Sequence, residues 1–141
     1  MLTKQLSIFL ENKRGRFTEV AKLMGEEGIN MTAFTVSENS DFGILRLIVS
    51  ETERAIKILR ENKYAVTEAE VICLHCPNQP GALGRAMDII TNAGIFIEYM
   101  YAFSEGESAN VIIRPDNMEN CIEILTANKL ELLAASDLYK L

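Results

Sequence analysis

The segment PNQPGALGRAMDIITNAGI, residues 77–95, determines how the rest of the sequence is interpreted. A proline and a glycine open an apolar run with helical spacing, and a second glycine, Gly94, closes it. Glycine adopts the left-handed backbone conformation without a Cβ clash, so it commonly lies just past the last residue of a helix. The segment therefore predicts a helix whose apolar face consists of Leu83, Ala86, Met87, Ile89 and Ile90.

An earlier segment, ENKRGRFTEVAKLMGEEGI at residues 11–29, is a fainter copy of the first. An offset of 66 residues aligns the two halves of the chain without a gap from Asn12 to Lys63. The identical pairs include Asn12/Asn78, Gly15/Gly81, Gly28/Gly94, Ile29/Ile95, Ile56/Ile122, Ile58/Ile124, Leu59/Leu125, Asn62/Asn128 and Lys63/Lys129. They fall on glycines and on apolar helix positions, which indicates a duplicated structural unit.

Each copy has the pattern strand, helix, strand, strand, helix, strand. Strands are expected at 6–10, 30–37, 43–49 and 64–69, and again at 71–76, 96–103, 109–114 and 129–134. The second helices are centred on 55–59 and 121–125, and polar turns are expected at 38–41 and 104–108. This pattern predicts an α+β protein of two tandem ferredoxin-like βαββαβ domains, residues 1–70 and 71–141, each with an antiparallel sheet and both helices on one face.

The composition excludes several classes of partner. The chain has 141 residues, of which 48% are hydrophobic, and a formal net charge of −6. Nucleic acids and anionic membrane surfaces attract basic proteins, so neither is expected as a partner. The sequence has no apolar run of membrane-spanning length and no signal-peptide pattern, so we expect a cytoplasmic protein with reduced cysteines.

The turn before the helix in the second copy has the components of an amino-acid pocket. A helix N-terminus presents unpaired N–H groups and a partial positive charge, which together hold a carboxylate. Pro80 fixes one backbone angle, Gly81 permits close approach of a ligand, and Asn78 offers both a donor and an acceptor.

On the NQPGAL loop, the GIN sequence at 28–30 and the βαββαβ order, the chain resembles the ACT domain family of ligand-sensing modules in amino-acid metabolism. The resemblance covers nearly the whole chain. It implies that an effector lies between the loop of one domain and the asparagine after the first helix of a neighbouring domain. The implied ligand-binding residues are Asn78, Gln79, Gly81, Ala82 and Leu83 on the loop side and Asn30 on the facing side.

The two copies depart from this pattern in different places. The first keeps Asn30 but has Arg14 in place of the loop proline, whereas the second keeps the proline but has Phe96 in place of the asparagine. We therefore expect one main site per chain that combines Asn78 with Asn30. A second, weaker site would combine Asn12, Gly15, Phe17 and Phe96. Leu83, Phe17 and Phe96 would favour a branched, aromatic or imidazole side chain on the ligand.

Simpler interpretations of the same residues remain open. The Pro-Gly pair is also typical of an ordinary turn, and Asn30 of an ordinary strand start. Cys73 and His75 of the CLHC segment point away from Cys76 on a strand, so no metal site is expected, and Cys121 lies on an apolar helix face. His75 has no partner that spacing identifies for catalysis and is expected on the outer sheet face. No catalytic residue and no cofactor are predicted.

Both faces of the strand at 96–103 are rather apolar, which favours a homodimer that covers the outer face of the sheet. The sequence thus predicts a free-standing regulatory protein that is not an enzyme and whose partners are a free amino acid, a second copy of the chain and a metabolic enzyme. The alternative is an interaction subunit without a ligand that modulates an enzyme of amino-acid metabolism.

Overall fold

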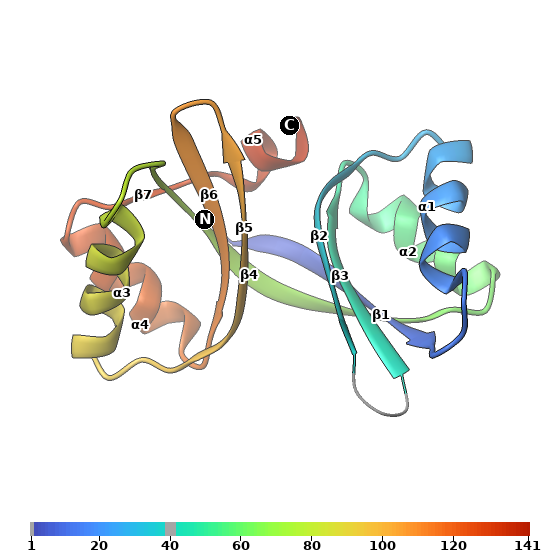
Figure 1. The fold of residues 1–141 in the computed structure, drawn as a ribbon, viewed down its shortest axis with the longest axis horizontal. Helices are drawn as coiled ribbons and strands as arrows, with labels where there is room; N and C mark the ends of the chain where they lie inside the picture. The colour runs from blue at the N-terminus through green and yellow to red at the C-terminus, as the bar shows by residue number, and fades with distance from the viewer. Residues whose placement is uncertain (1, 39–41) are drawn as a thin grey trace. The chain divides into compact units, whose positions relative to one another are not determined.

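A computed structural model describes residues 2–38 and 42–141 of the chain. The chain divides into two compact units. Figure 1 colours the chain from blue at the N-terminus to red at the C-terminus. The first-repeat unit comprises Lys4–Ala69 and Ser136–Leu141, and the second-repeat unit comprises Glu70–Ala135 together with Leu2 and Thr3. The repeat boundary at residue 70 is a sequence-based prediction. In the structure, Thr3 groups with the second repeat and Ser136–Leu141 groups with the first.

The first-repeat unit contains one antiparallel sheet with two helices on one face (Figure 1). Its elements are β1 (Thr3–Glu11), α1 (Arg16–Glu26), β2 (Met31–Glu38), β3 (Phe42–Val49), α2 (Thr52–Glu61) and the start of β4 (Ala65–Pro77). The strand order is β2-β3-β1-β4, and β3 pairs antiparallel with β1 and with β2. The predicted turn at residues 38–41 lies outside the described residues except for Glu38.

The second-repeat unit repeats this arrangement (Figure 1). Its elements are the second part of β4, α3 (Ala82–Asn92), β5 (Ile97–Glu105), β6 (Ser108–Pro115), α4 (Met118–Ala127) and β7 (Glu131–Leu132). Its strand order, β5-β6-β4-β7, corresponds element by element to that of the first unit. The predicted tandem ferredoxin-like fold is therefore confirmed.

Each unit has its own hydrophobic core between the sheet and its helices. In the first, Leu6, Ile8 and Leu10 of β1 are buried, as their alternation predicts. In the second, the matching residues Ile72, Leu74 and Cys76 of β4 are buried together with Cys121 of α4. The apolar faces of α1 and α3 complete the two cores through Val20, Met24, Ala86 and Ile90.

Both first helices end at the predicted glycines. Gly28 has φ 70° and Gly94 has φ 75°, which is the left-handed conformation. The next residue in each case folds back onto the helix, because the Ile29 N–H donates to Met24 O at 2.9 Å and the Ile95 N–H donates to Ile90 O at 3.2 Å. These bonds satisfy carbonyls that the helix end leaves free.

The end of the chain differs from the prediction. Instead of a strand at 129–134, only Glu131 and Leu132 pair with β4. A short helix, α5 (Ala135–Tyr139), follows, and Leu138 within it is fully buried. The sequence analysis missed this helix because five residues are too few to establish a helical period.

The sheet face opposite the helices in the second-repeat unit carries several buried or half-buried apolar side chains. Tyr101 of β5 pairs with Ile112 of β6 and is half-buried. Ile112 and Cys73 are both fully buried, although neither belongs to the core beneath the helices. His75 lies on this face, as predicted, and its Nδ1 is 2.7 Å from Oδ1 of the buried Asn110. Within the described residues, no helix has the length and hydrophobicity needed to cross a bilayer.

Candidate functional site

The loop between β4 and α3 carries the main predicted ligand-binding residues. The Asn78 N–H donates to Glu107 O at 2.8 Å, which ties the loop to the β5–β6 turn. Gly81 is the N-cap of α3 and has φ 89°, so a left-handed residue turns the chain into the helix. Its carbonyl accepts the Arg85 N–H at 3.0 Å and starts the helical hydrogen bonds. The left-handed backbone is one that glycine adopts without a Cβ clash, and the close approach of a ligand to Gly81 remains a prediction.

The polar side chains of this loop are available to a ligand. Asn78 and Gln79 are exposed, and within the described part of the chain neither amide has a hydrogen-bond partner. Leu83 is 37% exposed, whereas Ala82 is buried against the unit. The loop thus presents two free amides and one apolar side chain next to the N-terminus of α3, a combination suited to a small zwitterion.

Asn30 belongs to the other unit, where it lies between α1 and β2. Its backbone is fixed on both sides by Ser50, since the Asn30 N–H donates to Ser50 Oγ at 3.0 Å and the Ser50 N–H donates to Asn30 O at 3.0 Å. Its side-chain Nδ2 donates to Leu141 O at 3.0 Å. Asn30 is therefore exposed, and its backbone is held by two hydrogen bonds to Ser50. One of the two N–H donors of its side-chain amide is in use.

Phe96 occupies the position equivalent to Asn30 in the second-repeat unit. Asp116 takes the place of Ser50, because the Phe96 N–H donates to Asp116 Oδ1 at 3.1 Å and the Asp116 N–H donates to Phe96 O at 2.9 Å. The Phe96 side chain is 67% exposed. The same pair of backbone hydrogen bonds therefore holds Asn30 in one repeat and Phe96 in the other. The exposed side chain at this position is an amide in the first repeat and an aromatic ring in the second.

The equivalent loop of the first-repeat unit forms a small pocket. Asn12, Gly15 and Phe17, three residues of the predicted weaker site, line a cavity of about 150 Å³ together with Val36 and Gly43. Gly15 has φ 85° at the N-cap of α1 and so matches Gly81. Lys13 also lines this pocket, and its ammonium group pairs with Glu11 at 3.0 Å.

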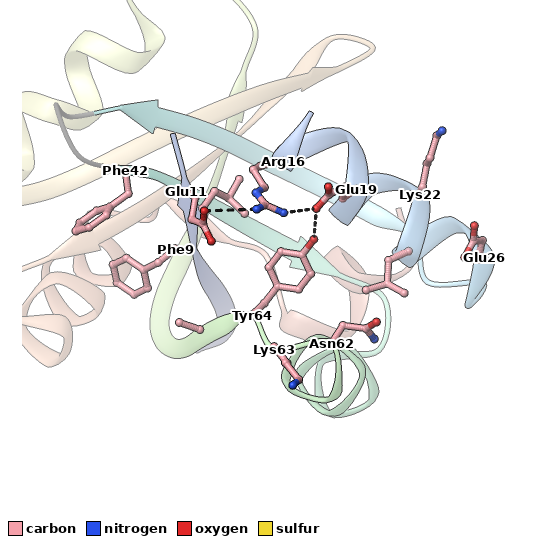
Figure 2. A pocket seen from close by; sticks show the side chains of 13 residues that line it. Phe9, Glu11, Arg16, Glu19, Lys22, Glu26, Phe42, Asn62, Lys63 and Tyr64 are labelled. Carbon is pink, nitrogen blue, oxygen red and sulfur yellow. Dashed lines mark hydrogen bonds and ion pairs between the residues drawn. The ribbon is translucent and has the colours of Figure 1, made fainter. Parts of the chain in front are cut away.

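A larger groove that the sequence analysis missed lies beside α1 in the first-repeat unit (Figure 2). It has a volume of about 820 Å³ and lies between α1 and the corner that joins α2 to β4. Arg16 donates from Nη1 to Glu19 at 3.0 Å and from Nη2 to Glu11 at 3.4 Å, and the Tyr64 hydroxyl donates to Glu19 at 3.0 Å. The i,i+3 spacing of Arg16 and Glu19 was visible in the sequence, but the contact with Tyr64 is tertiary.

Glu11, Arg16, Glu19 and Tyr64 of this groove form one network of hydrogen bonds and ion pairs. The Arg16 guanidinium and then the Tyr64 hydroxyl lower the pKa of the Glu19 carboxyl, and Lys13 and Arg16 lower that of Glu11. Partial burial, followed by the Glu19 carboxylate, raises the pKa of Tyr64. Both terminal nitrogens of Arg16 are engaged, so the network joins α1 to β1 and to the corner before β4, and Arg16 is not a free cation for an anionic ligand.

The cysteines are buried apolar groups. Burial raises the pKa of the Cys73 thiol to about 12 and that of Cys121 to about 11. Cys76 belongs to the core beneath the helices and Cys73 does not, which agrees with the predicted alternation along β4. Within residues 2–38 and 42–141, no group of three or more metal-ligating side chains converges on one point.

Comparisons with known proteins place this geometry in a family. The crystal structure of protein BT0572 from Bacteroides thetaiotaomicron is similar over 100% of this chain and 98% of its own, with 54% identity and a TM-score of 0.96. The ligand-free regulatory subunit of aspartate kinase from Thermus thermophilus matches 88% of this chain and 91% of its own, with 13% identity and a TM-score of 0.67, and therefore shares the fold. No curated protein matches the sequence. The family described as ACT domain pair matches residues 1–141, and the chain therefore belongs to it.

Proposed function

We propose that this protein is a regulatory protein that binds a free amino acid and controls an enzyme of amino-acid metabolism, without catalysing a reaction itself. The observation that carries the proposal is the β4–α3 loop, where a left-handed Gly81 opens a helix beside the exposed amides of Asn78 and Gln79. Membership of the ACT domain pair family supports a regulatory role. The aspartate kinase regulatory subunits with the same fold make a metabolic enzyme the first class of partner to test.

The loop assigns a role to each part of the ligand. The N–H groups in the first turn of α3 receive the carboxylate, because they carry the positive end of the helix dipole. The amide oxygens of Asn78 and Gln79 accept from the ammonium group, and their nitrogens donate to the carboxylate. Leu83 favours an apolar, branched or aromatic side chain. In this proposal Asn30 supplies the facing amide of the same site.

One main site per chain is proposed because the two loops differ in chemistry. The second loop has Pro80 and free amides, whereas the first has Arg14 and a paired Lys13. The facing residue is Asn30 in one unit and Phe96 in the other. The pocket at Asn12 is then a weaker site or an unused one.

The test is thermal unfolding of the purified protein with each of the twenty amino acids at millimolar concentration. A ligand present at 100 times its dissociation constant adds about 2.7 kcal/mol to the free energy of unfolding, which raises Tm by several degrees. The Asn78→Ala variant should lose this shift, and the matched variant Asn12→Ala should keep most of it. If no amino acid changes Tm at concentrations up to tens of millimolar, the sensor proposal fails. Calorimetry that gives two equivalent sites per chain contradicts the one-site form.

A second candidate function is an interaction subunit without a ligand. It is favoured by the exposed apolar side chains of the edge strand β2, since Phe34 is 50% exposed and Val36 is 44% exposed. Such an edge is a common place for another chain to pair or pack. We expect a homodimer in sedimentation analysis, and a Phe34→Ser variant that dissociates it would assign the contact to this edge. A monomer mass that does not change with concentration excludes this dimer.

A further inference from the structure

The side chain of Asn30 already forms a hydrogen bond with a distant residue of the same unit, Leu141. Its Nδ2 donates to the carbonyl oxygen of Leu141 at 3.0 Å, although the two residues are 111 positions apart in the sequence. The backbone of Asn30 is held on both sides by Ser50, so the amide is the part of this residue left for recognition. A carboxylate ligand uses the same N–H donors. The Leu141 main-chain oxygen takes one of the two Nδ2–H donors, so the segment and a ligand's oxygen use the same polar group.

The segment that carries Leu141 is held by few contacts. Leu138 is fully buried, and the Tyr139 hydroxyl accepts the backbone N–H of Lys4 at 2.9 Å. The last residues of the segment add the bond from Asn30 to Leu141 O and two turn bonds, from Lys140 N–H to Asp137 O at 3.3 Å and from Leu141 N–H to Leu138 O at 3.2 Å. A helix of five residues has no stability of its own, so the segment stays in place only through these anchors.

We propose that the segment Ser136–Leu141 competes with the amino-acid ligand for Asn30 and so sets the affinity of the site. This inference rests on the proposed function. When a binding-competent state is only partly populated, the observed dissociation constant rises in inverse proportion to that population. The docked segment leaves the ligand one N–H donor of Asn30 instead of two, so the docked state is the weaker-binding state. By linkage, a ligand that requires the Asn30 amide releases the segment to the same degree that the segment weakens the ligand.

The residues of the segment have distinct roles in this competition. Leu138 and Tyr139 are the anchors that hold it, and Leu141 is the residue that occupies the amide. Lys140 is exposed and serves as a control position, because its side chain has no hydrogen-bond partner within the described residues. Loosening the anchors should strengthen ligand binding, whereas a change at Lys140 should not.

The experiment compares ligand affinity in anchored and released chains. Each of the twenty amino acids is titrated by calorimetry into the unmodified protein, the double variant Leu138→Ala/Tyr139→Phe and the control Lys140→Ala. We expect the double variant to bind the same amino acid about fivefold tighter or more, a coupling of ordinary allosteric size, and the control to match the unmodified protein. Tyr139→Phe alone removes one anchor while leaving Leu138 buried, and it serves if the double variant does not fold.

Hydrogen exchange of the unmodified protein provides a second readout. The amides of residues 138–141 should exchange faster when the amino acid is bound, since the ligand displaces them. Equal or weaker binding by the folded variants, or unchanged or slower exchange with ligand, overturns the competition while leaving the sensor intact. If no amino acid binds any of the proteins, released variants included, the proposed function fails and the competition fails with it.

Discussion

Lys63 and Lys129, which are 66 residues apart, adopt the same left-handed backbone conformation, with φ of 67° and 60°. Each lies just past the second helix of its repeat. The following residues fold back in the same way, since the Tyr64 N–H donates to Leu59 O and the Leu130 N–H donates to Leu125 O, both at 3.0 Å. The preceding asparagines also agree, because Asn62 and Asn128 each donate from Nδ2 to a helix carbonyl at 2.8 Å.

A glycine at this position should stabilise the protein. The left-handed conformation costs a residue with a Cβ about 1–2 kcal/mol, and glycine avoids that cost but loses some of the gain to the entropy of the unfolded chain. We expect Lys129→Gly to raise the free energy of unfolding by about 1 kcal/mol in urea titration. Lys129→Ala, which retains the Cβ, is the control and should show no gain. A loss of stability in Lys129→Gly would mean that the lysine side chain contributes more than the strain costs.

The two second helices differ at their N-termini, which gives a second prediction. Asn117 caps α4 by accepting the Asn120 N–H at 3.0 Å. Glu51 holds the equivalent position before α2, and its side chain caps no N–H group there. Asn117→Ala should cost about 1 kcal/mol of stability, because a helix N–H group loses its partner. Glu51→Asn should raise the free energy of unfolding by a few tenths of a kcal/mol, because the exposed ion pair with Arg54 that it removes contributes little. Chemical denaturation of both variants measures these changes in the free energy of unfolding. An Asn117→Ala variant as stable as the unmodified protein would contradict the assigned cap.

The sequence predicted those features that depend on local chemistry. Gly28 and Gly94 were correctly interpreted as helix ends, because the left-handed conformation is a property of one residue and its neighbours. The repeated Asn-Lys pairs were visible as identities, but lysine is not a typical stop residue and their role became clear only from the backbone angles. Local patterns therefore located the ends of the first helices correctly, but they missed the lysine caps and the short helix α5.

Features that join distant parts of the chain were not predictable. The groove depends on Tyr64 meeting Glu19, and the occupied state of Asn30 depends on Leu141. No spacing rule connects such pairs. Of the predicted site residues, Asn12, Gly15 and Phe17 lie around one pocket. Asn78, Gln79 and Gly81 lie on the β4–α3 loop, and Ala82 and Leu83 begin α3. The pairing of Asn78 with Asn30 remains a prediction.

The glycines of the β4–α3 loop and its helix allow a matched test of the backbone. Gly81 has φ 89°, and a Cβ on it would lie 3.0 Å from Nη1 of Arg85, whereas Gly84 within α3 has no atom within 4 Å of its added Cβ. Gly81→Ala should destabilise the protein by about 1–2 kcal/mol through the strained backbone, since the arginine can move away. Gly84→Ala should stabilise it by about 0.5–1 kcal/mol, because alanine favours the helix. Thermal unfolding of the pair would contradict this account if both changes had the same sign.

The buried thiols predict a loss of stability at alkaline pH. Burial raises the pKa of Cys121 to about 11, so the thiol stays protonated in the folded protein at pH values where the unfolded chain, with a pKa near 9.0, has lost that proton. The folded state then binds more protons than the unfolded state, and the free energy of unfolding falls as pH rises from 9 towards 11. The contribution of this thiol is fully present below pH 9. Its slope approaches about 1.4 kcal/mol per pH unit for one proton.

Cys121→Ala isolates this contribution, because alanine is the residue that the first repeat carries at the equivalent buried position, Ala55. The variant should lose less stability between pH 9 and 11 than the unmodified protein, whatever its stability at pH 7. Val111→Ala, which removes buried volume without removing a thiol, should keep the original slope. Urea titrations at several pH values give these slopes. Parallel curves for Cys121→Ala and the unmodified protein would mean that the Cys121 thiol titrates normally in the folded chain, and its burial would then not govern its ionisation.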